Sequence, residues 1–461
     1  MENNLKLCSV QHYYEPSDSE CFKASDDEYT LIFMPDTQLT VSRDVQFAGY
    51  TAGPSTAGTG LTKGYYYNSI SELDMTKTFQ WIADNKDAMN LSFVMHMGDL
   101  KHSRGVTNAS YAGQNDWREW QLISGLSTVN ESFNTNGKTS YSFGTMTDFD
   151  LSSPWGFGIL RNSGIPYTVI LGNHDYDDFY MYGGTGRTAN YYNYYFSNDV
   201  YNSKFANNVV ARYDSNNMMN VIYEFSSSTK NGTTVKYLVV ALEFGPSDDM
   251  INWAKQIVSQ EKYKNHRIIW NSHYLVYSDG TYATGDSNWN PDTYGYSQDD
   301  GIDTNRGGEI YSSLISQFQN SFMAAGGHVS IESVTGRTDK GVNGNDIYGL
   351  LFDMQDTFNN RGDSFILVAK VNEKTKKITF RLYNPVLNKF YGVENEFEYD
   401  FSGYEVEEED KTLENTGFTS SDMDVSSASV RFADETYSTA VRFTTLIKKS
   451  DFEKSIFFKR S

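Results

Sequence analysis

Cysteine is almost absent from this chain of 461 residues, which holds only Cys8 and Cys21. Both precede the first expected strand, in an N-terminal arm of residues 1–25. One disulfide across this arm is consistent with an exported protein, and two inert thiols are the alternative, so both interpretations stay open. Neither cysteine has a setting typical of a catalytic nucleophile.

Basic residues are also scarce, since 38 lysines and arginines stand against 59 aspartates and glutamates, for a formal net charge of −21. No Lys/Arg-rich run offsets this charge, which disfavours nucleic acid or an anionic membrane as a partner. A substrate with a phosphate group would therefore need bound cations to supply local positive charge. Runs of about 18 or more apolar residues are missing as well, so no membrane span is expected.

Two common catalytic motifs are missing too. No Gly-x-Ser-x-Gly elbow precedes a helix, which disfavours a serine hydrolase. No Gly-x-x-x-x-Gly-Lys-(Ser/Thr) phosphate-binding loop is present, which disfavours a nucleotide-binding protein of that type. The glycine-rich residues 183–186 are followed by tyrosines and predict a loop.

Apolar residues are sufficient for a large core, at 39% hydrophobic and 15% aromatic. Their spacing predicts an α/β fold with a parallel sheet, because strand and helix patterns alternate near the N-terminus. We expect buried strands at residues 30–34, 91–97, 167–171 and 267–270. We expect helices at 75–89, 116–123, 250–258 and 310–322. Asn231-Gly232 predicts a hairpin between 221–225 and 235–244, and three consecutive antiparallel strands are expected at 347–352, 365–371 and 378–383.

The order of these elements also predicts domains. Residues 26–404 are expected to form the main domain, 405–412 an acidic linker, and 413–461 a small β-rich C-terminal extension. The polar insertion 101–154 follows a strand, where substrate loops are common. The tyrosine-rich residues 176–201 are interpreted as aromatic packing of a long surface loop, with a substrate-stacking platform as the alternative.

Five polar segments, each preceded by apolar residues, carry the side chains that ligate metals. In chain order they are Pro35-Asp36-Thr37-Gln38, Gly98-Asp99, Gly172-Asn173-His174-Asp175, Ser272-His273 and Gly327-His328. Ligands at the carboxyl ends of buried strands point into a common cleft. Mixed oxygen and nitrogen ligands suit manganese, iron or zinc, so the sequence predicts a metal site.

This ordered series resembles the calcineurin-like metallophosphoesterase family, and more closely the subgroup with Asp-x-Gln in place of Asp-x-His. The resemblance covers roughly residues 29–404. Supporting segments are Leu242-Glu243-Phe244-Gly245-Pro246, Ser272-His273-Tyr274-Leu275 and Asp353-Met354-Gln355. It implies a four-layer α/β/β/α sandwich and a pair of adjacent divalent metal ions of manganese, iron or zinc.

The resemblance also assigns the metal ligands. Asp36 and Gln38 would hold the first ion, Asp99 would bridge both, and the second would be completed by Asn173, His273 and His328. A carboxylate can bridge ions about 3.5–4 Å apart, which agrees with this assignment. Hydroxide bridging the two ions would attack the phosphate ester.

Two departures from the family pattern weaken the first site more than the second. Gln38 is neutral and a poorer donor than imidazole. The family ends its last motif in Gly-His-x-His, whereas Ser330 stands at the final position here. Water or an unidentified side chain would then fill that coordination position.

Four further residues complete the prediction. The resemblance makes His174 a catalytic residue near the leaving group, with Asp175 orienting its imidazole. His102 lies three residues past Asp99 and is a weaker candidate for lining the substrate cleft. His96 lies within an apolar strand and is expected to be a core residue.

The expected function is hydrolysis of a phosphate monoester or diester by a monomeric enzyme. The small phosphate ester is its expected partner, with no nucleic acid and no membrane span. The alternative is a surface or carbohydrate-contacting module that kept the fold and lost turnover. Composition favours an extracellular or cell-surface location, with the cytoplasm still open.

Overall fold

The computed structural model describes residues 22–47, 70–102, 116–126, 132–133, 141–142, 153–177, 187–285, 287, 289–294, 304–331, 333–355, 364–392 and 396–404. The chain divides into two compact units, Met1–Val406 and Glu407–Ser461, and every described residue belongs to the first. The predictions for Cys8, Cys21, residues 183–186, most of 101–154 and the C-terminal stretch from 405 lie outside the described residues.

The first sheet is mixed and has seven strands. Along it run β15, β14, β13, β1, β2 and β5, and β16 also pairs with β14. The pairs β1–β2 and β2–β5 are parallel and the others are antiparallel. Its strands are β1 (Glu28–Met34), β2 (Leu91–His96), β5 (Tyr167–Thr168), β13 (Ile366–Asn372), β14 (Lys377–Asn384), β15 (Lys389–Phe390) and β16 (Glu396–Asp400).

The second sheet is also mixed and has seven strands, in the order β11-β12-β10-β9-β8-β7-β6. Strands β8, β9, β10 and β12 run parallel. Its strands are β6 (Val209–Arg212), β7 (Val221–Ser228), β8 (Thr234–Leu242), β9 (Arg267–Ser272), β10 (Ser321–Gly326), β11 (Thr335–Lys340) and β12 (Asp346–Leu351). A separate two-stranded sheet pairs β3 (Ser132–Phe133) with β4 (Tyr141–Ser142).

The expected hairpin is confirmed in β7 and β8, which pair from Val221 opposite Ala241 to Ser228 opposite Thr234. Gly232 at its turn has φ 92°, a left-handed conformation that glycine adopts without strain. The expected helix at 75–89 is also confirmed as α2. It buries Met75, Phe79 and Ile82 along one face and ends at Asn90 in the left-handed region.

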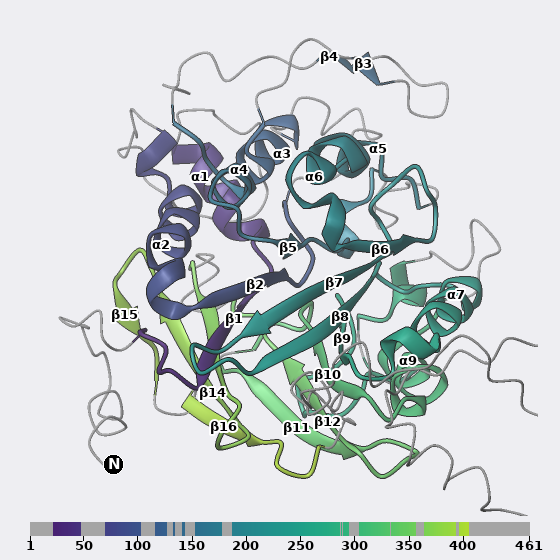
Figure 1. The fold of residues 1–461 in the computed structure, drawn as a ribbon. Helices are drawn as coiled ribbons and strands as arrows, with labels where there is room; N and C mark the ends of the chain where they lie inside the picture. Colours follow the sequence, from purple (N-terminus) through teal and green to yellow (C-terminus); the bar gives the residue numbers. More distant parts are fainter. Residues whose placement is uncertain are drawn as a thin grey trace, which may run out of the picture. The chain divides into compact units, whose positions relative to one another are not determined.

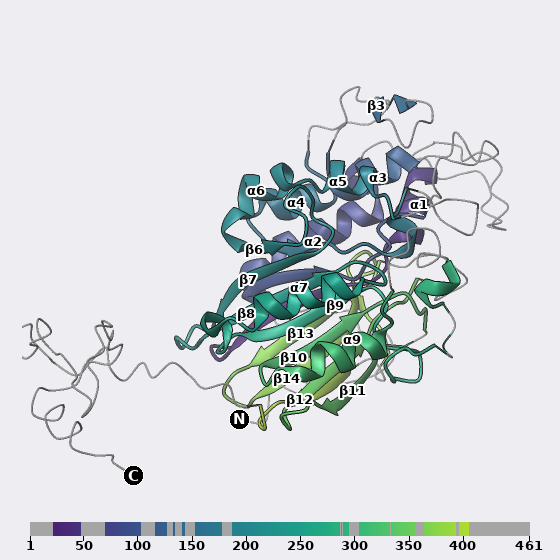
Figure 2. The same cartoon turned by 90° about the vertical axis from the view of Figure 1, so that its right-hand side faces the viewer.

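The helices fall into two groups in Figures 1 and 2: α1 to α6 lie together on one side of the strands, and α7 and α9 lie beside the second sheet. They are α1 (Gln38–Phe47), α2 (Asp74–Met89), α3 (Asp116–Ser124), α4 (Phe157–Asn162), α5 (Asn190–Tyr195), α6 (Asn198–Phe205), α7 (Asp248–Val258) and α9 (Gly307–Ser313). Among the helices in the described part of the chain, none is both long and apolar enough to cross a membrane.

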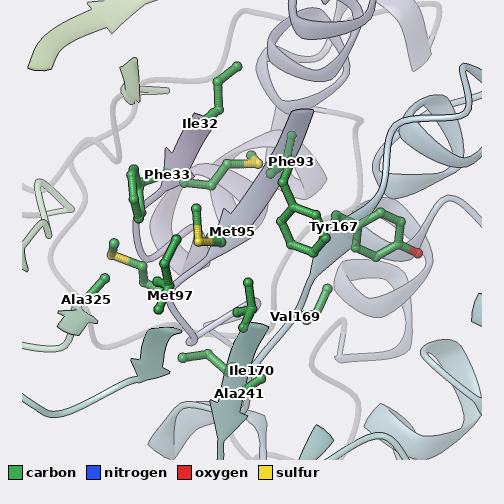
Figure 3. Packing of buried hydrophobic residues seen from close by; sticks show 14 of the residues in the cluster. Ile32, Phe33, Phe93, Met95, Met97, Tyr167, Val169, Ile170, Ala241 and Ala325 are labelled. Carbon is green, nitrogen blue, oxygen red and sulfur yellow. The ribbon is translucent and has the colours of Figure 1, made fainter. Parts of the chain in front are cut away.

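Side chains from the two sheets pack directly against each other. Phe93 on β2 stacks on Phe225 of β7 at 4.4 Å between ring centroids, and Tyr348 on β12 stacks on Phe380 of β14 at 5.5 Å. Figure 3 shows the interior of this core, where residues such as Met95 of the first sheet lie near Ala241 and Ala325 of the second. The core is therefore shared between the sheets, which brings their strand ends together.

Several predicted elements are wrong in extent or neighbour. The expected helix 310–322 is a short α9, a 3₁₀ turn at Ile315–Gln317 and the start of β10. The expected strand 167–171 is strand only at Tyr167–Thr168. Strand β12 pairs with β10 and β11 in the second sheet rather than with β13.

For the tyrosine-rich segment, the expected aromatic packing is correct and the expected surface loop is wrong. Its aromatic side chains do pack, since Tyr191, Tyr192, Tyr195 and Tyr201 are buried. They lie on α5 and α6 rather than on a surface loop. The Tyr192 hydroxyl donates to the carbonyl of Val169 at 2.9 Å, so this segment is anchored to the core.

Candidate functional site

The polar segments meet because they follow strands that end at the same edge of the two sheets. Asp36 lies two residues beyond β1, and Asp99 lies three beyond β2, in the first sheet. His273 directly follows β9, and His328 lies two residues beyond β10, in the second sheet. Backbone hydrogen bonds join the loops in pairs, from Thr37 N to Asp99 O at 3.1 Å and from Gly327 N to His273 O at 2.9 Å.

The centre of the site is a buried trio of Asp99, His273 and His328. One ligand atom from each lies within 4.8 Å of the other two. The His273 Nε2 atom is 3.2 Å from Asp99 Oδ2 and 3.1 Å from His328 Nδ1. A carboxylate and two imidazoles form a donor set that suits manganese, iron or zinc.

The backbone fixes which nitrogen of each imidazole faces this centre. His273 Nδ1 lies 2.6 Å from the Met97 carbonyl, and His328 Nε2 lies 2.9 Å from the Trp289 carbonyl. A carbonyl oxygen only accepts, so each of these nitrogens carries the hydrogen. When both rings are neutral, the other nitrogen of each ring turns a lone pair toward this centre, and a cation between the three groups would satisfy all of them.

Local backbone geometry shows how tightly this centre is built. Asp99 and His328 have φ of 51° and 70°, which non-glycine residues rarely adopt. A Cβ added to Gly172 would lie 2.0 Å from Asp99 Oδ1, and one on Gly98 would lie 2.5 Å from His273 Nδ1. Both glycines are therefore needed because site side chains fill the space that their own side chains would take.

Asp36 and Gln38 form a second group next to the trio. The Gln38 backbone N–H donates to Asp36 Oδ1 at 3.0 Å, and its amide Nε2 donates to Asp36 Oδ2 at 3.1 Å. The same Nε2 lies 3.4 Å from Asp99 Oδ2, the atom that also faces His273. Asp99 thus stands between the two groups, which is the position expected of a bridging carboxylate.

The segment Asn173–Asp175 is a 3₁₀ turn beside Asp99, with Asn173 and Asp175 buried. The His174 backbone N–H donates to Asp99 Oδ1 at 2.8 Å. Asp175 accepts from the backbone N–H groups of Leu100 and Gly172 at 2.9 and 2.8 Å. The Asp175 carboxylate therefore braces the two loops, and its expected role in orienting the His174 imidazole stays a prediction.

His174 and His102 stand together at the edge of the site, both partly buried. Their rings stack at 5.6 Å between centroids, and His174 Nδ1 lies 3.3 Å from the His102 carbonyl. His102 Nδ1 lies 3.0 Å from Gln38 Oε1, so the structure brings this weaker candidate into the site. His96 is fully buried and pairs with Thr37 Oγ1 at 3.0 Å, which confirms it as a core residue.

Burial and mutual repulsion give the carboxyl groups unusual proton affinities. Burial and then the nearby charges of Asp99 and Asp353 raise the pKa of Asp36 well above its usual value. Burial and then Asp99 raise the pKa of Asp175 to about 8. Burial also acts to raise the pKa of Asp99, but His273 and His174 outweigh it and lower that pKa. Several acidic groups thus compete for the same few positive charges, a situation that bound cations relieve.

Burial has the opposite effect on the imidazoles. It lowers the pKa of His328 to about 3, with a further contribution from His273. Burial also acts to lower the pKa of His273, but Asp99 and the Met97 carbonyl outweigh it and raise that pKa. His328 is therefore neutral at physiological pH, the form in which imidazole binds a metal.

Two residues near Asp36 belong to a supporting segment of the family resemblance but are given no task at the site. Asp353 is fully buried and influences Asp36 electrostatically, and Gln355 accepts a hydrogen bond from Gln38. The sequence signal that marks them is a second Asp-x-Gln directly after an apolar run, the same pattern as Asp36-Thr37-Gln38.

No family model matches the chain. It is 23% identical over 250 residues to YvnB, an uncharacterized protein of Bacillus subtilis (strain 168), a match that covers 54% of this chain and 13% of that protein's length. Among solved structures, it is similar to GAP50, the anchor in the inner membrane complex of Plasmodium, with 8% identity, a TM-score of 0.34 and coverage of 81% of this chain and 88% of that one. A score of this size does not establish a shared fold.

Proposed function

We propose that this protein is a metal-dependent phosphoesterase with two adjacent divalent cations. The observation that carries the proposal is the buried trio, in which His273 Nε2 lies 3.2 Å from Asp99 Oδ2 and 3.1 Å from His328 Nδ1. Asp36, Gln38 and Asn173 would complete the ligand set. The acidic site and the net charge of −21 fit a protein that binds a phosphate ester through cations.

The fold is proposed to be a four-layer α/β/β/α sandwich of the calcineurin-like metallophosphoesterase type. Two features support this arrangement. The two sheets pack against each other through buried aromatic side chains, and the helices form two separate groups, α1 to α6 and α7 with α9, beside the strands in Figures 1 and 2.

The site residues have separate tasks in the proposed reaction. Bound divalent ions would supply a water activated near neutral pH and positive charge for the phosphoryl oxygens. Asp99 and the histidines hold the ions, and Asp175 keeps the two loops around Asp99 in register. His174 Nδ1 lies 3.3 Å from the His102 carbonyl, and the doubly protonated His174 ring would give a proton to the leaving oxygen.

The test is hydrolysis of nitrophenyl phosphate monoesters and diesters in the presence of Mn²⁺, Fe²⁺ or Zn²⁺. We expect turnover by the wild type, a loss of about 10²–10⁴-fold in His174→Ala, and background activity in Asp99→Ala. His266→Gln is the matched control, because His266 lies just before β9, at the opposite end of that strand from His273, and pairs with Glu224. It should keep full activity.

The same assay separates the enzyme from its alternative. Equal background in the wild type and both site variants, with every metal and ester, contradicts the proposed activity. It would favour the carbohydrate-contacting module that the sequence left as the second interpretation.

A further inference from the structure

We propose that Asp353-Met354-Gln355 belongs to the first cation site, where Gln355 Oε1 is a ligand and Asp353 holds the Gln355 side chain in place. This inference rests on the proposed function. Gln355 would fill the coordination position of the family's last histidine, where Ser330 stands in this chain. The family resemblance gives the segment Asp353-Met354-Gln355 no metal-binding role.

The segment is a structural copy of the Asp36-Thr37-Gln38 segment. In each, the aspartate stands two residues beyond a strand, β1 or β12. In each, the glutamine backbone N–H donates to one aspartate oxygen at 3.0 Å. In each, the amide Nε2 donates to the other oxygen, at 3.1 Å for Gln38 and 3.2 Å for Gln355.

The two copies meet at one point. Gln38 Nε2 lies 2.5 Å from Gln355 Oε1, 3.1 Å from Asp36 Oδ2 and 3.4 Å from Asp99 Oδ2. An amide nitrogen has two hydrogens, so three oxygens from three separate strand ends surround a group that cannot donate to all of them well. These oxygens form a cage around the end of the Gln38 side chain, which is the environment that a small cation prefers.

A divalent ion beside the Gln38 amide would take oxygen ligands from Asp36, Asp99 and Gln355. Gln38 would add its own oxygen by turning its amide, since its Nε2 would then face His102 Nδ1, which now lies 3.0 Å from Gln38 Oε1. His102 can accept as well as donate, depending on its tautomer. A cage of oxygen ligands suits Mn²⁺.

The chain brings this segment to the loop where a ligand is missing. The Ile331 backbone N–H, next to Ser330, donates to the Asp353 carbonyl at 3.0 Å. Phe352 N donates to the Gly326 carbonyl at 3.0 Å, which ties the same segment to the loop of His328. Gln355 is buried, with 9% of its surface exposed, so its polar amide points into the protein rather than into solvent.

The test is Mn²⁺ binding to the full chain by equilibrium dialysis and calorimetric titration at pH 7.5, for wild type, Gln355→Met and Gln355→Glu. We expect two ions per wild-type chain. Gln355→Met should keep one and bind the other about 10–100-fold more weakly. Gln355→Glu retains an oxygen and adds charge, so it should bind that ion at least as tightly as the wild type, although its metal-free form should melt at a lower temperature.

Asp44→Asn is the matched control, because Asp44 is a fully buried carboxyl bonded to the backbone of α2 rather than to the site. It should bind two ions with unchanged affinity. Two ions with wild-type affinity in Gln355→Met, or weakened binding in Gln355→Glu equal to that of Gln355→Met, overturns the inference alone. A wild type that binds no divalent ion overturns the inference together with the proposed function.

Discussion

At the scale of single residues, Asp99 determines what its neighbours can be. Its carboxylate fills the space beside Gly172, where an added Cβ would lie 2.0 Å from Oδ1. The backbone of Gly172 has φ −95° and ψ −178°, which any residue adopts. The need for glycine there comes from the site itself and not from the turn.

Gly172→Ala should therefore displace Asp99 from the trio with His273 and His328. We expect a loss of about 1–3 kcal/mol in the free energy of unfolding, as overpacking produces, and weaker Mn²⁺ binding. Denaturant titration and calorimetry measure the two effects. Gly285→Ala is the control, since its nearest neighbour is an Arg306 side-chain atom at 3.6 Å, and it should change neither.

The sequence predicted which site residues come together better than it predicted their hydrogen-bond partners. Asp36, Asp99, His273 and His328 come together because each follows an apolar run, and strands that end at one edge bring such residues together. The bracing role of Asp175 and the contact of Gln355 with Gln38 depend on loops that meet only in three dimensions. No local pattern contains those distances.

At the scale of elements, one side chain on α1 secures the start of α2. Asp44 is fully buried and accepts from the backbone N–H groups of Asp74 and Met75 at 3.2 and 2.8 Å. Leu73, the residue before α2, makes no side-chain cap bond. Asp44 on α1 thus satisfies free backbone N–H groups at the start of α2, the helix beside which α1 packs.

Stability should depend on the protonation of Asp44. Burial and then the charge of Asp74 raise its pKa from 3.8 to about 7 in the folded state. A raised pKa means that the folded protein binds the proton more tightly than the unfolded chain. The contribution of protonated Asp44 to the free energy of unfolding is therefore complete below about pH 4 and is lost as the pH rises to about 7. This contribution is on the order of 4 kcal/mol.

Asp44→Asn mimics the protonated carboxyl and should remove this dependence. Denaturant unfolding of wild type and variant between pH 4 and pH 7.5 measures it. We expect the free energy of unfolding of the variant to increase relative to that of the wild type as the pH rises. A difference between the two proteins that stays constant over this range contradicts the assigned pKa.

The elements also show where sequence patterns are insufficient. The apolar run at residues 321–326 is fully buried as β10 between β9 and β12, and a strand covered on both sides has no alternation to distinguish it from a helix. Strand β12 was expected beside β13, its next neighbour in sequence. It pairs with β10 instead, because sheet partners are chosen by packing over long distances.

At the scale of the whole described unit, a buried ion pair joins the two sheets. Arg267, at the start of β9, donates from Nη1 and Nη2 to both carboxylate oxygens of Glu373, just after β13, at 2.5 and 2.9 Å. The Tyr29 hydroxyl also donates to Glu373, at 2.8 Å. Removing one partner leaves the other charge buried and uncompensated.

Arg267→Met should accordingly cost about 3–5 kcal/mol in the free energy of unfolding, because Glu373 loses its partner. The exposed pair Lys377–Glu398, at 2.8 Å, is the matched control. Glu398→Gln there should change stability by about 1 kcal/mol or less. Equal losses of unfolding free energy in Arg267→Met and Glu398→Gln, measured by thermal or denaturant unfolding, would contradict the larger cost assigned to breaking the buried pair.

The proposed activity requires that strand ends from both sheets bind divalent cations around Asp99. Anomalous X-ray diffraction at the manganese edge, on crystals grown with Mn²⁺, tests it most directly. We predict one anomalous peak at coordination distance from Asp99, His273 and His328, and a second beside Asp36 and Gln38. A well-ordered crystal with no manganese at the two histidines would contradict the account.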